Sequence, residues 1–185
     1  MSPFNNDLAE FLRDEFEPLI TPLVNITKKK YKYLNINFSK EIEDRFKILS
    51  PSDFGFHNSI RNIKGELFFI DFEYFGWDDP AKLVGDFLLH PAIENLDFYI
   101  NEWKLFYKLI LNIFDSDKEF NSRLLINLPL LSMRWALILL NEFIPSNWER
   151  RIFAGEKKSR NTILKHQLKK AKKYTRLVKW SLNVD

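Results

Sequence analysis

The chain contains no cysteine among its 185 residues. This absence excludes disulfide bonds, thiolate catalysis and zinc sites built from cysteine, and it is typical of proteins from a reducing compartment. The amino terminus also lacks the basic start and apolar core of a signal peptide. We therefore expect a cytoplasmic protein.

Glycine and proline are scarce, with 5 and 8 residues, and no linker-like or low-complexity stretch is present. The most apolar stretch, residues 124–145, is interrupted by polar residues and a proline, namely Asn127, Pro129, Arg134, Asn141 and Glu142. This pattern predicts a buried helix and no transmembrane segment. The length suits one large domain with a sizeable core, so we expect a single domain over residues 1–185.

Acidic residues are missing from the last part of the chain. Residues 157–179 contain about ten Lys or Arg and no Asp or Glu. We interpret this run as the solvated face of a helix with an inward apolar stripe, formed by Leu164, Leu168, Ala171, Leu177 and Val178. The alternative is contact with a phosphate backbone or an anionic membrane surface. Aromatic residues for base stacking are sparse in the run, so no nucleic-acid partner is expected.

Hydrophobic periodicity predicts a mainly helical chain. Residues 7–23 have a helical pattern that Pro22 ends, and a basic loop follows at residues 28–32. Ser39 is expected to cap a second helix, which ends at residues 45–50. Further helices are expected near residues 98–114, 118–125, 130–143, 147–153 and 159–182.

One β-hairpin is expected within this helical sequence, at residues 58–72. Its arms are residues 59–61 and 66–72, and residues 62–65 form the turn. Residues 67–70 of the second arm are all apolar. This run predicts an arm buried on both faces.

A capped helix is expected directly after the hairpin. Asp79 followed by Pro80 has the form of an N-cap with proline at the first helical position. The helix should reach about Leu89, where His90 and Pro91 end it.

The residues around the hairpin have the order and spacing of a phosphoryl-transfer site. Such a reaction needs a carboxylate that orients the attacking hydroxyl and accepts its proton, and oxygen ligands for the magnesium that bridges the nucleotide phosphates. Asp53 precedes the hairpin, Asn58 follows five residues later, and Asp71 follows the second arm. Asp and Asn also occur in loops for turn chemistry alone. The full set, followed by the capped helix, favours catalysis.

These motifs resemble the carboxy-terminal lobe of the aminoglycoside phosphotransferase and choline kinase family, which has a protein-kinase-like fold. Members carry Asp, four intervening residues and Asn, and then an apolar strand ending in Ile-Asp-[Phe/Trp]-Glu. Here these are Asp53 to Asn58 and residues 70–73. The resemblance implies a mainly α (α+β) fold, in which a small hairpin carries the catalytic and metal-binding loops.

The resemblance also implies a role for each motif residue. Asp53 would be the catalytic base, Asn58 and Asp71 would bind magnesium, and Asp86 would brace the catalytic loop from the next helix. ATP and Mg²⁺ would be the cofactors. The acceptor would be a hydroxyl group of a small molecule such as an amino alcohol, a sugar or an aminoglycoside.

Two features depart from the family pattern. Pro51 stands where the family usually has His, two residues before the base. Residues 53–55 spell Asp-Phe-Gly, the metal-binding signature of protein kinases, but no His-Arg-Asp loop lies upstream. The Asn at plus five and the hairpin downstream favour Asp53 as the base instead.

The three histidines are not expected to form a site. His57 is interpreted as a loop residue rather than as a second base. His90 and His166 lie far apart in the sequence and suggest no metal site.

An acidic and aromatic stretch follows the second arm of the hairpin. Glu73, Tyr74, Trp77 and Asp78 would lie near the acceptor and could suit a cationic substrate. The alternative is that the aromatic residues belong to the core and the acids only shape the loop and cap the helix.

The nucleotide-binding lobe of such enzymes has no counterpart in this sequence. The stretch before Asp53 has no strand-rich segment, no Gly-rich loop and no lysine in a strand context. We therefore expect that lobe on a separate chain, or else a truncated or fragmentary chain that is inactive by itself. Two alternatives are a non-catalytic lobe that binds a partner or regulates, and a helical domain whose Asp and Asn residues only shape turns.

Overall fold

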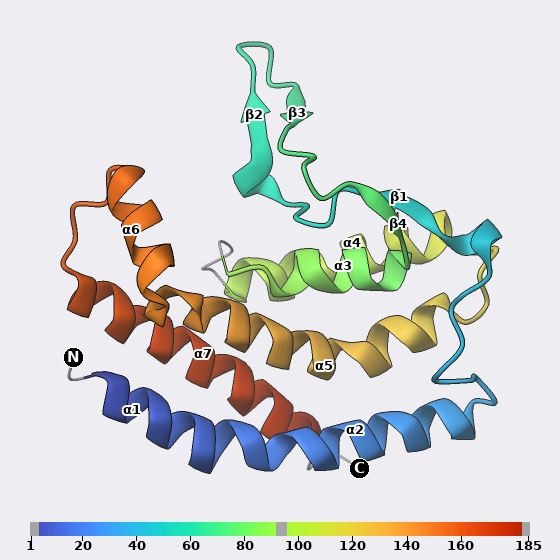
Figure 1. Cartoon of the computed structure of the whole chain (residues 1–185). Helices are drawn as coiled ribbons and strands as arrows, with labels where there is room; N and C mark the ends of the chain where they lie inside the picture. Colours follow the sequence, from blue (N-terminus) through green and yellow to red (C-terminus); the bar gives the residue numbers. More distant parts are fainter. Residues whose placement is uncertain (1–3, 92–95, 183–185) are drawn as a thin grey trace. The chain divides into compact units, whose positions relative to one another are not determined.

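The computed structural model describes residues 4–91 and 96–182. Most of these residues are helical, and the strands form two small two-stranded sheets (Figure 1). The expected mainly α (α+β) class is confirmed at this level. The chain divides into two compact units, which we call the terminal unit (Met1–Lys30 with Pro129–Asp185) and the central unit (Tyr31–Leu128). Every site residue that the sequence predicted lies in the central unit.

The first helical stretch is longer than the sequence predicted. It consists of α1 (Phe4–Glu10), a π-helical turn (Phe11–Phe16) and α2 (Glu17–Tyr33). Pro22 lies inside α2, so the predictions that it ends the helix and that residues 28–32 form a loop are wrong. Proline inside a helix costs about 3 kcal/mol. Burial of Leu19 and Leu23 on either side of Pro22 offsets that cost.

The helix predicted to begin at Ser39 does not form. The Ser39 amide donates to Asn37 Oδ1 within a turn, and the only helical piece that follows in this segment is a 3₁₀ turn at Asp44–Phe46. Glu41, shortly after Ser39, pairs with Lys47 instead of lying in a helical turn. Short helices are marginal in water unless an apolar face is buried, and this segment is mostly exposed.

Two short antiparallel sheets lie in the central unit. Strand β1 (Ile48–Ser50) pairs with β4 (Gly76–Asp78), and β2 (Ser59–Arg61) pairs with β3 (Leu67–Phe69). The β2–β3 hairpin lies within the predicted residues, whereas the pairing of β1 with β4 was not predicted. Figure 1 shows that β1 and β4 run beside one another where the chain enters and leaves the hairpin segment.

The hairpin turn forms as its residues predicted, but its second arm does not. Asn62 Oδ1 accepts hydrogen bonds from the amides of Lys64 and Glu66, and Gly65 adopts a φ of 85° that favours glycine. Phe68 on the second arm is 55% exposed. The prediction that this arm is buried on both faces is therefore wrong, because the sheet has two strands and Phe68 is left uncovered.

The helix after β4 confirms its sequence signal. Helix α3 (Pro80–Leu89) begins with Asp79 as its N-cap, and Asp79 Oδ1 accepts a hydrogen bond of 2.8 Å from the Ala81 amide. The remaining helices are α4 (Leu96–Ile113), α5 (Phe120–Leu140), a 3₁₀ turn (Asn141–Phe143), α6 (Pro145–Phe153) and α7 (Arg160–Leu182). Helix α5 replaces two predicted helices, because Pro129 lies inside it.

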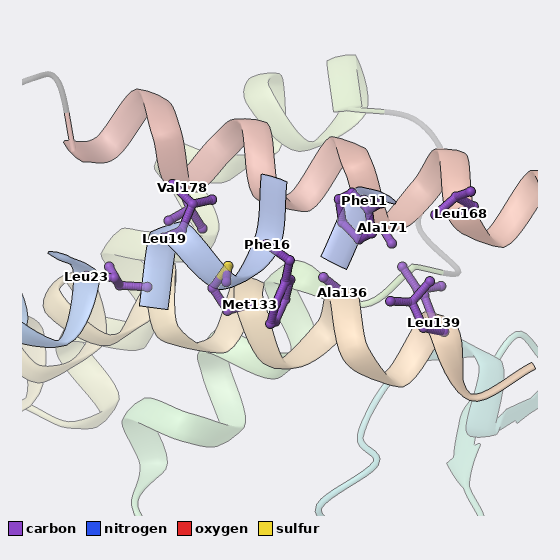
Figure 2. Packing of buried hydrophobic residues seen from close by; sticks show 11 residues of the cluster. Phe11, Phe16, Leu19, Leu23, Met133, Ala136, Leu139, Leu168, Ala171 and Val178 are labelled. Atoms are coloured by element: carbon purple, nitrogen blue, oxygen red, sulfur yellow. The ribbon is translucent and has the colours of Figure 1, made fainter. Parts of the chain in front are cut away.

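Each unit has its own apolar core. Figure 2 shows the core of the terminal unit, where side chains from the first helical stretch, α5 and α7 meet. These residues are Phe11, Phe16, Leu19, Leu23, Met133, Ala136, Leu139, Leu168, Ala171 and Val178. The central unit buries Ala81 and Val84 of α3 against Phe120 and Leu124 of α5. Side chains of α4 pack against this second core.

The basic carboxy-terminal run has the inward apolar stripe that its sequence predicted. Leu164, Leu168, Ala171 and Val178 are buried. Leu177 is 44% exposed, so its place in the stripe was wrong. Neighbouring residues on a helix point about 100° apart, and Val178 takes the inward position.

One helix in the described part of the chain, Phe120–Phe143, is long and apolar enough to cross a membrane. Of its most apolar window, 44% is buried within the protein. A single helix of this kind is weak evidence for a membrane span, because core helices of other proteins have the same length and composition.

Candidate functional site

The predicted base and the first predicted metal ligand lie on one loop of the central unit. The loop leaves β1 and ends in a 3₁₀ turn at Phe56–Asn58. Asn58 Nδ2 donates to the backbone oxygen of Asp53 at 2.9 Å and lies 3.4 Å from its carboxylate Oδ2. The five-residue spacing thus closes the loop on itself. The Asp53 side chain is 46% exposed, so a substrate can reach it.

The hairpin returns the chain to this loop just before Asp71. The Ile70 amide donates to the Asn58 backbone oxygen at 2.9 Å. Asp71 is the next residue, is exposed, and adopts a φ of 65°, which is unusual for a residue with a side chain. The second arm of the hairpin therefore ends beside the loop, and the role of Asp71 as a metal ligand remains a prediction.

An aromatic cluster under the loop was not predicted. The Phe54 ring lies 4.6 Å from that of Phe69 on β3 and 5.8 Å from that of Phe87 on α3. Phe87 also packs against Phe56 at 5.7 Å and against Phe106 of α4 at 5.3 Å. The rings of Phe54 and Phe56, which follow Asp53 on the loop, therefore fix the loop to the hairpin and to α3.

Asp86 lies buried on α3, with 4% of its side chain exposed. The Lys82 ammonium lies 3.7 Å from Asp86 Oδ2 and also pairs with Asp78. Asp86 is buried on the helix that packs beneath the loop, and this position suits a residue that braces the loop. That Asp86 braces the loop remains a prediction.

The four residues expected near the substrate lie on β4 and on the segment before it. Tyr74 and Trp77 are exposed, and Asp78 pairs with Lys82. Trp77 and Asp78 line a hollow of about 800 Å³ whose walls do not include residues of the Asp53–Asn58 loop. Glu73 is exposed on the loop before β4. Glu73 and Tyr74 follow Asp71 closely in the sequence, and a substrate role for the four residues remains a prediction.

His90 lies beside the predicted base, an arrangement that the sequence did not indicate. His57 Nε2 is 3.1 Å and His90 Nε2 is 3.7 Å from the same Asp53 oxygen, Oδ1. The two imidazole rings are stacked, with centroids 3.8 Å apart and planes 2° from parallel. The two histidines are 33 positions apart in the sequence, so no rule based on local spacing predicts their contact.

A buried ion cluster fixes the start of α3. Arg123 of α5 bonds the N-cap residue Asp79 at 2.8 Å and Asp117 at 2.6 Å. Burial acts to raise the pKa of Asp117, but the hydrogen bonds and charge of Arg123 outweigh it and hold that pKa below its ordinary value. For Arg123 burial acts to lower the pKa, and the two carboxylates outweigh it, so the pKa is raised and the charge is permanent.

No family model, curated protein or solved structure matches this chain. What can be said of function therefore depends on the residues themselves. The described geometry brings Asp53, Asn58 and the end of the second hairpin arm together beside a cluster of aromatic rings. It adds two histidines that the sequence did not associate with the site.

Proposed function

We propose that this chain supplies the base and the magnesium-binding residues of an ATP-dependent phosphotransferase that acts on a small-molecule hydroxyl. The observation that carries this proposal is a pair of hydrogen bonds: Asn58 Nδ2 to Asp53, and the Ile70 amide to Asn58. Together they gather the loop and the strand end, from which Asp53, Asn58 and Asp71 project. The order, spacing and local structure of these residues are those that phosphoryl transfer requires.

Each residue has a task in this proposal. Asp53 is accessible, and its carboxylate orients the acceptor hydroxyl and takes its proton. Asn58 donates through Nδ2, which leaves its amide oxygen as a ligand, and Asp71 adds an exposed carboxylate. These hard oxygen donors fit Mg²⁺. When bound, the ion would neutralise the charge of the nucleotide phosphates.

The nucleotide must be held in part by protein outside the described residues. The hairpin beside the loop leaves Ile60, Phe68 and Ile70 exposed. Such an apolar surface supports contact with a nucleotide-binding lobe, on this polypeptide or on another. The proposed acceptor is a small molecule with a hydroxyl group, such as an amino alcohol, a sugar or an aminoglycoside.

The test is transfer of the ATP γ-phosphate to a panel of these acceptors, with the nucleotide-binding lobe present. Asp53→Ala should lower kcat by roughly 10²- to 10⁴-fold, because the proton acceptor is lost. Asn58→Ala and Asp71→Asn should raise the magnesium concentration needed for half-maximal rate. Asp115→Ala, an exposed aspartate away from the loop, is the matched control. Full turnover by Asp53→Ala would refute the assignment.

The exposed hairpin also favours a second candidate, a non-catalytic module that binds a partner. Ile63 at its tip is fully exposed, and Phe68 is exposed beside it. In this reading the motif residues are structural. Magnesium-dependent ATP binding that Asp71→Asn abolishes would count against the module. Its absence, together with partner binding that Phe68→Ser weakens, would support it.

A further inference from the structure

Three side chains, two from the loop after β1 and one from the end of α3, converge on one point. Asp53 lies on the loop after β1, His57 lies in the 3₁₀ turn, and His90 follows the last turn of α3. Their ligand atoms all lie within 4.8 Å of one another. We propose that Asp53, His57 and His90 bind a divalent transition metal of the zinc class, at a site distinct from the magnesium ligands Asn58 and Asp71.

The distances fit such an ion. Zinc bonds to imidazole nitrogen and carboxylate oxygen are about 2.0–2.1 Å long, and a tetrahedral arrangement then separates the donor atoms by about 3.3 Å. Asp53 Oδ1 lies 3.1 Å from His57 Nε2 and 3.7 Å from His90 Nε2. Both distances lie within half an ångström of that separation. The rings are parallel in this structure, and the lone pair of each nitrogen lies in its ring plane, so one imidazole must tilt out of the stack to direct both nitrogens at one ion.

The ligand chemistry separates this site from the magnesium position. Two imidazole nitrogens and one carboxylate oxygen suit zinc, cobalt or nickel, whereas magnesium prefers oxygen alone. Three protein ligands leave a fourth position for water or another oxygen donor. The His57 and His90 side chains are 24% and 13% exposed, whereas Asp53 is 46% exposed, so the open position lies on the carboxylate side.

The surroundings hold the three ligands in place before any ion binds. Asn58 fixes Asp53, as described above. The His57 ring lies against the backbone of Gly55, where an added Cβ would be 2.7 Å from its Nδ1. His90 is anchored by its amide, which donates to the Phe87 carbonyl at 3.4 Å, and Phe87 packs against Phe56 beside His57. The packing of the loop against α3 therefore holds both histidines.

Occupation of this site has a consequence that depends on the function proposed above. An ion bound to Asp53 Oδ1 takes the lone pair that would accept the hydroxyl proton. His57 Nε2 must also release any proton that it shares with Asp53. Transition metals of this class should therefore inhibit the transferase, while magnesium supports it.

The binding test uses the full chain without a histidine tag. Titration with Zn²⁺ by calorimetry should give one site, and Co²⁺ should give the visible absorption of a tetrahedral complex. The affinity should fall by more than about tenfold in His57→Ala and in His90→Gln, because even residues that only orient metal ligands cost about 10- to 100-fold. The third histidine of the chain, His166, is exposed on α7, and His166→Ala is the matched control.

Nuclear magnetic resonance separates metal binding from loss of fold. Zn²⁺ should shift the imidazole signals of His57 and His90 and leave that of His166 unchanged. Gly55→Ala, which displaces the His57 ring, should weaken binding without removing a ligand. Equal Zn²⁺ affinity in the wild type, His57→Ala and His90→Gln would overturn the proposal, as would a shift of all three histidines alike.

The two proposals fail separately. Zn²⁺ binding at these residues without any phosphotransfer would refute the proposed function and keep the metal site. Phosphotransfer that depends on Asp53 but is insensitive to Zn²⁺, with no shift of His57 or His90, would refute the metal site and keep the function.

Discussion

Arg123 is the residue on which the position of α3 most depends. Its guanidinium bonds both oxygens of Asp79 and both of Asp117, and 4% of its side chain is exposed. Asp79 also caps α3, so one arginine joins the helix start to the loop before α5. A buried charge that loses its partner costs more than the pair contributes when intact.

Arg123→Met should therefore destabilise the protein by about 3–5 kcal/mol. The reason is that Asp117 would stay buried without its cation. The measurement is the free energy of unfolding in urea. Arg13→Met, which removes an exposed arginine paired with Asp14, should cost much less, because an ion pair in solvent contributes little. Equal costs for the two variants would show that the cluster is not a structural clamp.

The lowered pKa of Asp117 also leads to a prediction of how the stability of the protein depends on pH. Its pKa is lower in the folded protein than the ordinary value of 3.8, so its carboxylate stabilises the fold above about pH 4. This contribution is lost as the pH falls through the folded pKa. Urea unfolding between pH 6 and pH 2 should show a steep loss in the wild type.

Asp117→Asn should be less stable at pH 6 but should lose less stability on acidification, because the group that titrates has been removed. Asp115→Asn is the control, since Asp115 is exposed. An unchanged pH dependence in Asp117→Asn would contradict the assignment of acid sensitivity to this pair.

At the scale of the element, α2 is a helix in which packing outweighs the tendency of a proline to end a helix. Pro22 removes one backbone donor from the helix interior and crowds the preceding turn. The helix continues because Leu19 and Leu23 are buried around it. A π-helical turn precedes α2, and such turns commonly absorb irregular hydrogen bonding within a helix.

Pro22→Ala should raise the free energy of unfolding by about 1–3 kcal/mol and leave helix content unchanged. The helix already extends through this position, so the substitution removes strain without adding helical residues. Urea unfolding and far-ultraviolet circular dichroism measure the two quantities. A clear gain in helical signal would mean that the proline ends the helix in solution.

At the scale of the whole molecule, the two units have separate cores. Leu124 is fully buried in the central unit, and Leu139 is buried in the terminal unit. Each core holds side chains from elements that are distant in the sequence. The free energy of local unfolding can therefore differ between the two units.

Leu124→Ala should destabilise the protein by about 2–5 kcal/mol and speed amide exchange in α3 more than in α7. Leu139→Ala should have the reverse preference. Hydrogen exchange followed by mass spectrometry measures both. Equal acceleration throughout the chain in both variants would show that the two units open as one.

The sequence by itself determined the features that depend on near neighbours. The hairpin turn at Asn62 and Gly65 and the cap at Asp79 formed because each is stabilised by bonds within a few residues. The bond between Asp53 and Asn58 belongs to the same class, so the core of the candidate site could be predicted.

Only the tertiary structure decided the features that join distant residues. Arg123 reaches Asp79 across 44 positions, and His90 lies against Asp53 through the packing of α3 on the loop. Pro22 and Pro129 stayed inside helices because burial of their neighbours outweighed local propensity. Such contacts form where packed helices and loops bring distant side chains together. The spacing of residues along the sequence does not reveal which side chains will meet in this way.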